Sequence, residues 1–247
     1  MPRRYFLETL LESDAEVAEL TGQEAQHLAK VMRAKPGDQV ELFDGSGFQF
    51  AAIVSEVTRH TVNLEIQSRE QVSREATRTV TIAVSLPKGD RQKWLVEKLC
   101  EIGVTTVIPL TTERSVAQPT DKALTRLHRC VIEASKQCGR NTLMVIEFPQ
   151  SLGDLIEHSN HEFTCVVAHP HLNTDTDANT SGVKGVNAIT TDRPVIAAIG
   201  PEGGFSDEEV EAAVQSGFAP LSMGPRILRV ETAAIAISSS LIYADDK

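Results

Sequence analysis

The chain has 247 residues, of which 41% are hydrophobic and 23% are charged, a composition typical of a globular protein with room for one large domain or two ordinary ones. No apolar run is long enough to span a membrane, and Glu8 and Glu12 interrupt the stretch after the first arginines, so we expect a cytoplasmic protein without a secretory signal. The net charge of −10 excludes a protein that coats nucleic acid through bulk positive charge, but it permits a locally basic face.

Neither the cysteines nor the histidines indicate a metal site or a disulfide framework. The cysteines are widely spaced and form no CxxC pair, so we expect free, buried thiols. The HxxH at 158–161 and the HPH at 169–171 lack a helical carboxylate at ligand spacing, so we expect no metal. The cysteines are Cys100, Cys130, Cys138 and Cys165.

Residues 1–70 have the pattern of short strands joined by tight turns. A PGD turn at 36–38 and a DGSG turn at 44–47 separate segments in which apolar residues alternate with polar ones. This pattern predicts a small β-barrel. Residues 71–78 lack an apolar period and are expected to link it to a second domain at 79–247. The alternating apolar residues are Val40, Leu42, Phe48, Phe50, Ala52 and Val54.

From residue 79 onward, apolar strand patterns alternate with helical patterns. The first helix is expected to be capped by Asp90, to end near Gly103, and to place Trp94, Leu95, Leu99 and Ile102 on one face. The alternation predicts an α/β domain with a parallel sheet covered by helices on both faces. Ligands of such sheets bind at the carboxyl ends of the strands. The expected strands are 79–86, 104–110, 143–148, 162–170, 193–200 and a short one near Leu221, and the later helices run through 121–139 and begin at Ser151, Ser206 and near Glu231.

The segment "IGPEGGFSDEEV" at 199–210 follows a strand and begins a helix, as a phosphate-binding loop does. Its glycines do not have the GxGxxG spacing, and it lacks a GK[ST]. Ser206 and Glu209 form a capping box, and the acids of the first helical turn would repel a pyrophosphate. The loop therefore predicts a ligand that is not a polyanion. The second glycine loop, "MGPRILRVETA" at 223–233, can close with the first around one flat ligand.

Two basic stretches, 69–93 and 114–140, stand out in this acidic chain. A solvated helix face explains the second stretch if it is taken alone. The two together favour a polyanionic partner that approaches from one side.

The two glycine loops, together with five further stretches, resemble a known family, the SPOUT methyltransferases. The likeness is to the 16S ribosomal RNA uridine N3-methyltransferases in particular (the RsmE family). The resemblance runs over nearly the whole chain. Met223 and Val230 depart from it, because we would expect leucine and threonine there. The stretches are "HLAKVMRAKPGD" (27–38), "LFDGSG" (42–47), "KGDRQKWLVEKLCEIGV" (88–104), "TERSV" (112–116) and "EASKQCGR" (133–140).

The resemblance implies a PUA-like barrel that helps to bind RNA, followed by a domain with a C-terminal trefoil knot whose loops bind S-adenosylmethionine. It also implies a homodimer through the C-terminal domain and, as substrate, 16S ribosomal RNA within the small ribosomal subunit. The implied cofactor contacts are Ala168, His169, Pro170, Ile199, Gly200, Pro201, Glu202, Gly203, Gly204, Ser222, Met223, Gly224, Ile227 and Leu228. The candidate RNA contacts are Arg3, Arg4, Arg33, Lys88, Arg91, Arg114, Arg126, Arg129 and Arg140.

The implied reaction places a methyl group on N3 of a uridine, which carries a proton at neutral pH and must lose it first. We expect Arg229 to stabilise the uridinate, and Glu202 to accept the proton or contact the cofactor. The alternative for Arg229 is an ion pair with Glu231 or Glu202 that only fixes the loop. Two other functions remain open: a dinucleotide-dependent α/β enzyme, which the glycine spacing disfavours, and a non-catalytic RNA-binding module with this fold.

Overall fold

The structure is a computed structural model, and it describes residues 3–115, 119–159, 161–169, 184–185, 189 and 192–243. Contacts within the chain divide it into two compact units. The first unit consists of Met1–Glu75 and Ser135–Leu143, and the second of Ala76–Ala134 and Met144–Lys247. A division at residues 70 and 79 leaves Ser135–Leu143 in the second domain, whereas the structure packs this segment with the first unit.

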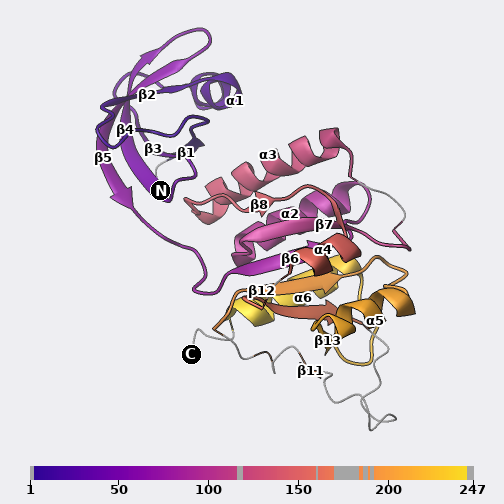
Figure 1. The fold of residues 1–247 in the computed structure, drawn as a ribbon. Coiled ribbons are helices and arrows are strands. Elements are labelled where there is room, and N and C mark those ends of the chain that lie inside the picture. The colour runs from indigo at the N-terminus through magenta and orange to yellow at the C-terminus, as the bar shows by residue number, and fades with distance from the viewer. Residues whose placement is uncertain are drawn as a thin grey trace. The chain divides into compact units, whose positions relative to one another are not determined.

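The described part of the first unit is built on a five-stranded sheet in the order β1-β3-β4-β5-β2 (Figure 1). β1 and β3 are parallel, and the other neighbours are antiparallel. The alternation between Val40 and Val54 is confirmed, since all its members are buried except Phe48, which is partly buried. The strands are β1 (Arg3–Phe6), β2 (Val17–Leu20), β3 (Gln39–Phe43), β4 (Phe48–Val57) and β5 (Val62–Gln71).

The expectation of strands alone in this unit is wrong for residues 22–31, which form helix α1 (Gly22–Gln26) and the π-helical turn η1 (His27–Val31). Ala25 and Leu28 are buried in the core of the sheet, and Ala29 and Met32 pack against that core. This spacing of three and four residues is a helical period. A single short amphipathic turn covers one end of the sheet core.

The segment Ser135–Leu143 is held in the first unit by two arginines that we expected to contact RNA. Arg4 donates hydrogen bonds to the carbonyl oxygens of Ser135 at 2.8 Å and Arg140 at 3.0 Å. Arg140 is only 3% exposed and forms an ion pair with Glu75. The side chain of Asn141 donates to the carbonyl oxygen of Val72 at 2.8 Å. Arg4 and Arg140 therefore hold the chain together and are not available as RNA contacts, which corrects that expectation.

The second unit contains the predicted parallel sheet, in the order β11-β13-β10-β12-β6-β7-β8 with β9 beside β7. Every pairing that the described residues form in it is parallel. β6 and β12 are buried over their whole length, as expected of central strands with helices on both sides. The strands are β6 (Val80–Val84), β7 (Thr106–Thr111), β8 (Val145–Ile146), β9 (Gln150–Ser151), β10 (Thr164–Ala168), β11 (Lys184–Gly185), β12 (Val195–Ile199) and β13 (Ala219–Ser222).

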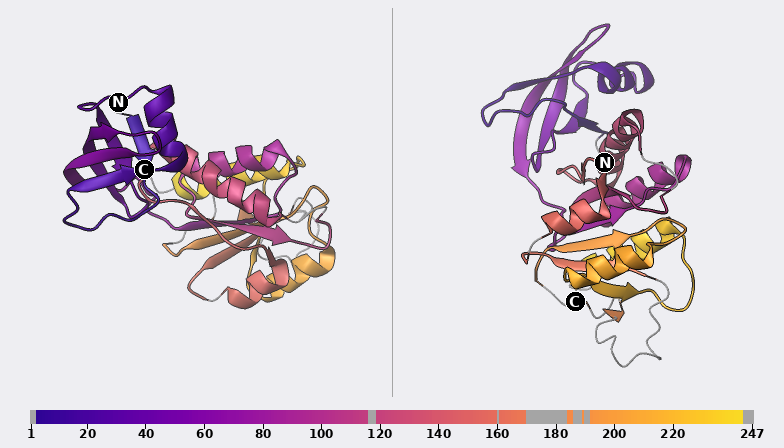
Figure 2. Two further views of the ribbon diagram at one scale, coloured as in Figure 1. Left: turned by 90° about the horizontal axis from the view of Figure 1, so that it is seen from above. Right: turned by 45° about the vertical axis from the view of Figure 1, so that its right-hand side comes forward.

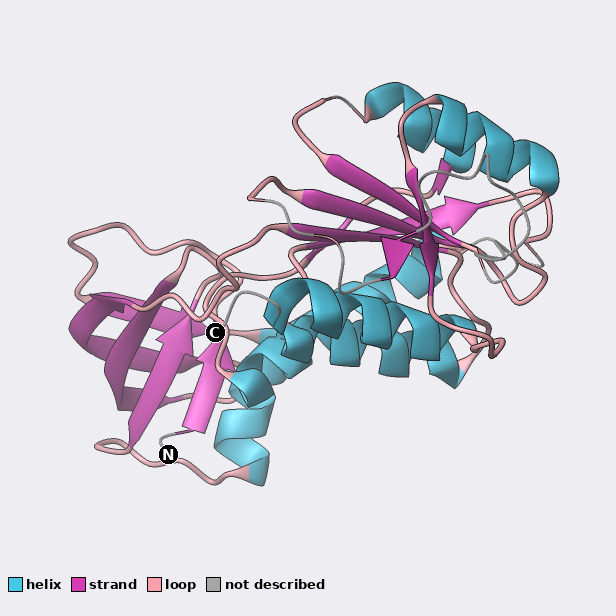
Figure 3. Ribbon diagram, turned by 90° about the horizontal axis from the view of Figure 1, so that it is seen from below, coloured by secondary structure: helices cyan, strands magenta, loops and turns pink. Residues whose placement is uncertain are grey.

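Helices cover both faces of this sheet (Figure 2, Figure 3). One face carries α2, α3 and α6, and the other carries α4 and α5. Among the described residues, no helix has the length and apolar character that a membrane span requires. The helices are α2 (Asp90–Ile102), α3 (Asp121–Cys138), α4 (Leu152–His158), α5 (Asp207–Gln215) and α6 (Val230–Tyr243).

Two details of α2 differ from the expectation. Its N-cap is Gly89, which makes no side-chain cap, so Asp90 is the first helical residue and not the cap. Trp94 is 47% exposed, and the buried face instead contains Leu95, Val96, Leu99 and Cys100. The helix does end at Gly103, which has a left-handed φ of 106° that favours glycine.

Candidate cofactor pocket

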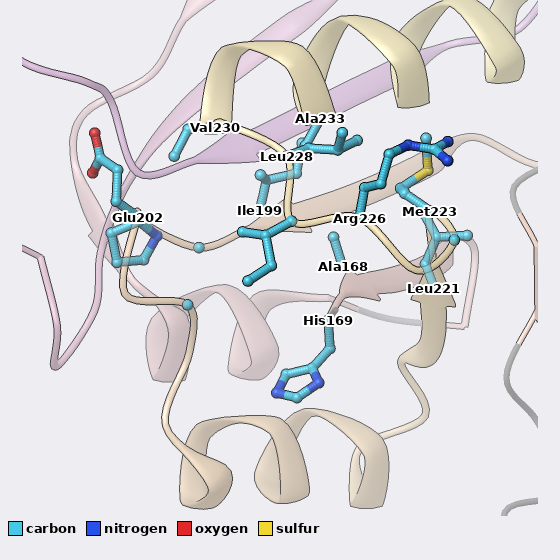
Figure 4. Close-up of a pocket in the computed structure, with 15 residues that line it drawn as sticks. Ala168, His169, Ile199, Glu202, Leu221, Met223, Arg226, Leu228, Val230 and Ala233 are labelled. Atoms are coloured by element: carbon cyan, nitrogen blue, oxygen red, sulfur yellow. The ribbon is translucent and has the colours of Figure 1, made fainter. Parts of the chain in front are cut away.

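A pocket lies where three adjacent strands of the second unit end (Figure 4). β10 ends at Ala168, β12 at Ile199 and β13 at Ser222. The N–H of His169 donates to the carbonyl oxygen of Leu221 at 3.1 Å, so the sheet stays ordered up to the pocket. The volume is about 600 Å³, counting the part open to solvent.

Most of the cofactor contacts implied by the sequence are brought together here. Gly203 and Ser222 lie outside the lining, and Pro170 lies outside the described residues. The expected residues that line the pocket are Ala168, His169, Ile199, Gly200, Pro201, Glu202, Gly204, Met223, Gly224, Ile227 and Leu228.

Four lining residues were missed by sequence reasoning. Leu221 precedes an expected contact by one residue, and Arg226 lies inside the second glycine loop. Val230 and Ala233 are three residues apart in the first turn of α6, so they share a face of that helix. The three-residue spacing in the helix after the loop could therefore have predicted that both residues line the pocket. α6 closes the pocket from the side opposite the strand ends. The small side chain of Ala233 takes up little of the space there.

The first glycine loop, residues 199–204, is shaped by two glycines with different physical reasons. A Cβ on Gly200 would lie 3.0 Å from the backbone nitrogen of Phe205 and 3.1 Å from the carbonyl carbon of Gly204, so there is no room for a side chain. Gly204 has a φ of +70°, a conformation that L-residues rarely adopt. A Cβ on Gly203 would meet Arg114 at 3.5 Å, which is an ordinary contact. The loop is thus crowded at Gly200, not at Gly203.

A second segment, at the end of β7, anchors this loop. Arg114 donates to the carbonyl oxygens of Gly203 and Phe205 at 3.0 and 3.2 Å. The N–H of Glu113 donates to the carboxylate of Glu209 at 2.9 Å. The predicted capping box is confirmed, because the other oxygen of Glu209 accepts from the N–H of Ser206 at 2.9 Å, and the Ser206 hydroxyl accepts from the N–H of Glu209 at 3.3 Å.

One arginine joins the two acids that flank the pocket. Arg91 lies 3.2 Å from Glu202 and 3.4 Å from Glu231, measured between guanidinium nitrogen and carboxylate oxygen. Glu202 lines the pocket, and Glu231 follows Val230 in the first turn of α6. Arg229 is exposed and does not line the pocket. The ion pair expected as an alternative for Arg229 therefore belongs to Arg91.

The remaining candidate RNA contacts lie at several places on the two units. Arg126 and Arg129 are exposed on α3, and Lys88 is exposed just before α2. In the first unit Arg33 is exposed, and Arg3 is exposed while donating to the carbonyl oxygen of Met32 at 3.3 Å. Arg91 and Arg114 are exposed too, but both hold elements of the pocket.

The thiols take no part in the pocket. All four cysteines are free; Cys100 and Cys130 are buried, whereas Cys138 and Cys165 are only partly buried, which differs from the expectation. Burial raises the pKa of the Cys130 and Cys165 thiols and so keeps them in the unreactive protonated form. Within the described residues, no group of three or more His, Cys, Asp or Glu side chains is arranged to hold a metal ion.

The residues of the pocket fit S-adenosylmethionine better than a dinucleotide. Ile199, Leu221 and Leu228 provide apolar surface for a flat ring, and Glu202 provides a negative charge for a cationic ligand. The first turn of α5 carries Asp207, Glu208 and Glu209, which oppose a pyrophosphate at that helix N-terminus. Figure 4 shows Glu202 and Val230 at one end of the pocket and Arg226 with Met223 at the other. Both charge signs are thus available to a ligand that carries both.

Comparisons with protein families agree with this fold and pocket. A model described as the RNA methyltransferase domain matches residues 74–242, and one described as the RNA methyltransferase PUA domain matches residues 20–67. The two units and the pocket therefore define an RNA methyltransferase with a PUA-like sheet at its N-terminus.

Relatives place the chain more closely. It is 30% identical over 98% of its length to the ribosomal RNA small subunit methyltransferase E of Bacillus subtilis, 96% of which is covered. The protein of that name from Neisseria gonorrhoeae, solved bound to S-adenosylmethionine, is 28% identical with a TM-score of 0.86, covering 98% of this chain and 96% of that one. A Legionella pneumophila structure with the bound cofactor SAM is 31% identical with a TM-score of 0.87, covering 99% and 98%. The chain belongs to the family of ribosomal RNA small subunit methyltransferase E.

Proposed function

We propose that this chain transfers a methyl group from S-adenosylmethionine to N3 of a uridine in the 16S RNA of the small ribosomal subunit. The observation that carries the proposal is the pocket at the ends of β10, β12 and β13, whose first loop turns so tightly at Gly200 that no side chain fits there. Its charges suit a cationic cofactor, and the Neisseria relative was solved with that cofactor bound. A ribosomal substrate also favours a cytoplasmic location.

The cofactor, when bound, supplies a methyl group attached to a positively charged sulfur. Ile199, Leu221 and Leu228 would hold the ligand by apolar contact. The target uracil must enter so that N3 points along the axis of the bond to be broken. Because N3 of uracil is protonated at neutral pH, residues at the open edge must take that proton or stabilise the charge that its loss leaves on the ring oxygens.

The runner-up is a dinucleotide-dependent enzyme, which uses the same end of a parallel sheet. The acidic first turn of α5 speaks against it. Calorimetric titration with S-adenosylmethionine and with NAD separates the two. We expect binding of the former alone, and binding of NAD alone would refute the proposal.

We also infer that two copies pair through the second unit and that its C-terminal part forms a trefoil knot. Support for the pairing comes from large apolar side chains left exposed on this unit, Trp94 at 47%, Ile227 at 75% and Tyr243 at 54%. Twofold pairing is the commonest assembly of soluble proteins. Light scattering should give the mass of a dimer at micromolar concentration, and a monomer there would contradict the inference.

The third candidate function is a non-catalytic RNA-binding module. A measurement of methyl transfer to RNA distinguishes it from the methyltransferase. Small subunits and protein-free 16S RNA, both lacking the modification, are incubated with the protein and the cofactor carrying a radioactive methyl group. We expect radioactivity in the RNA of the subunit. Binding of RNA with no transfer to either substrate would favour the non-catalytic module.

A further inference from the structure

Arg91, Glu202 and Glu231 form a cluster in which one guanidinium serves two carboxylates. The three residues come from distant parts of the chain: the first turn of α2, the first glycine loop and the first turn of α6. If all three are ionised, the cluster has one negative charge in excess. Its charges are therefore not balanced within the cluster, and a further positive charge or hydrogen-bond donor is favoured there.

The two ion pairs of Arg91 lie in different environments. The side chain of Glu231 is 10% exposed, whereas that of Glu202 is 51% exposed and that of Arg91 is 44% exposed. An exposed ion pair contributes little and exchanges easily, whereas a buried carboxylate needs its partner. Glu231 is therefore the anchor of Arg91, and Glu202 is the exchangeable partner.

A second observation points to a missing hydrogen-bond donor in this cluster. Oε2 of Glu231 is buried and has no hydrogen-bond partner in the described structure, although Oε1 is paired with Arg91. A buried carboxylate oxygen without a partner is costly, and groups of this kind are enriched at functional sites.

The position of the cluster matches the requirement for a charged group at the edge of the pocket. Glu202 lines the pocket at the end where Val230 lies, as Figure 4 shows. Arg229, the cation expected from the sequence, is exposed and outside the lining. Arg91 does not line the pocket either, but its ion pair with Glu202 brings its guanidinium to that edge. Arg226 lines the opposite end, so Arg91 is the guanidinium beside Glu202.

We propose that Arg91 and Glu202 are a catalytic pair that the substrate separates: a ring oxygen of the target uracil replaces Glu202 on Arg91, and the released Glu202 accepts the N3 proton. This inference rests on the proposed methylation of uridine N3. The N3–H bond breaks, the proton bonds to a carboxylate oxygen of Glu202, and the electron pair stays on the uracil, shared between N3 and its ring oxygens. The negative charge thus moves from Glu202 to the uracil, and Arg91 faces it there.

In this arrangement Glu231 is a positioning residue. It fixes the guanidinium through a buried contact while the outer edge of Arg91 changes partner. The exchange also explains why the base is paired in the free protein. Arg91 holds the carboxylate of Glu202 at the edge of the pocket until the substrate takes Arg91 away.

The test compares small subunits reconstituted with 16S RNA made from uridine or from 5-fluorouridine, whose N3 loses its proton more readily. Single-turnover methylation is measured with saturating cofactor. We expect Arg91→Ala to slow the uridine reaction about a hundredfold to a thousandfold. With 5-fluorouridine the loss should shrink to about tenfold, because less stabilisation of the uridinate is needed. Glu202→Gln should cost about a hundredfold or more with uridine. In both variants the loss of cofactor affinity should be much smaller than the loss of rate.

Three further variants control for folding and for general effects. Arg91→Ala leaves Glu231 buried without a partner, so the double variant Arg91→Ala with Glu231→Gln removes that charge and should restore thermal stability without restoring the rate. Glu231→Gln alone should lower the rate less than Arg91→Ala does. Arg193→Ala, at the opposite end of β12 from the pocket, should keep the wild-type rate.

An equal loss of rate with uridine and 5-fluorouridine would show that Arg91 only holds the loops, and would overturn the proposal. A fall in cofactor affinity as large as the fall in rate would overturn it too. Wild-type protein that methylates neither substrate would instead remove the proposed function on which it rests.

Discussion

The guanidinium of Arg114 donates a hydrogen bond to the carbonyl oxygen of Gly203 at 3.0 Å, across 89 positions of sequence. It makes a further bond to the carbonyl oxygen of Phe205, so one side chain fixes both ends of the turn that closes the first glycine loop. Backbone carbonyls held from behind leave the opposite side of the loop for the ligand. Arg114 therefore positions the cofactor loop, whatever else its exposed edge contacts.

Arg114→Ala should weaken binding of S-adenosylmethionine about tenfold. Loss of one hydrogen bond to a charged donor is worth about 1.5–3 kcal/mol, and part of this is recovered by water at an exposed site. Arg114→Lys should be intermediate, because an ammonium reaches one carbonyl more readily than two. Isothermal calorimetry measures both. Wild-type affinity in the alanine variant would remove Arg114 from the support of the loop.

Gly200→Ala should abolish measurable cofactor binding or weaken it by at least about tenfold. The new Cβ would lie 3.0 Å from the Phe205 nitrogen, so the loop must shift. Gly203→Ala is the matched control, since its Cβ would make an ordinary contact with Arg114 at 3.5 Å. If Gly203→Ala bound the cofactor more weakly than Gly200→Ala, the conclusion that the loop is crowded at Gly200 would be contradicted.

Ser206→Ala should lower the free energy of unfolding by about 1 kcal/mol, the usual contribution of an N-cap side chain. The hydroxyl of Ser206 caps α5 directly after the glycine loop. Ser151→Ala offers a comparison, because Ser151 and Asp154 form the same capping box on α4, away from the pocket lining. Urea denaturation should give similar losses in both variants, and only Ser206→Ala should also weaken cofactor binding. Equal cofactor affinity in the two would show that the cap and the loop are uncoupled.

Replacement of Arg126 and Arg129 by glutamate should weaken RNA binding and flatten its dependence on salt. Both side chains are exposed on α3, and each phosphate that a protein neutralises adds about one unit to the slope of log affinity against log salt. The affinity for S-adenosylmethionine should not change. Filter binding across a salt series measures the slope. An unchanged slope would show that these arginines lie on a solvated helix face and do not contact RNA.

Local sequence patterns were sufficient to predict the main strands and the parallel sheet of this protein. The alternation of apolar residues predicted β3 and β4, and the alternation of strands and helices predicted the parallel sheet and placed the ligand at the strand ends. The capping box at Ser206 and the helix end at Gly103 were likewise visible, because each depends on residues at most three positions apart or on one glycine.

Long-range contacts account for what the sequence did not reveal. Charge alone grouped Arg4, Arg91, Arg114 and Arg140 as RNA contacts. In the structure Arg91 reaches Glu202 across 111 positions, and Arg4 reaches the carbonyl of Arg140 across 136. A guanidinium that satisfies a carbonyl or a carboxylate looks the same in sequence as one that faces RNA. The prediction for Trp94 was wrong because a large apolar residue was assumed to face the core, although its side chain is half exposed.

Nucleoside mass spectrometry of 16S RNA from small subunits treated with the purified protein and S-adenosylmethionine tests directly which atom is methylated. The subunits must come from cells that lack this modification. We expect one 3-methyluridine per 16S RNA, a smaller yield when the protein carries Gly200→Ala, and none without the cofactor. Methylation at another atom, or no methylated uridine with protein that binds the cofactor, would contradict it.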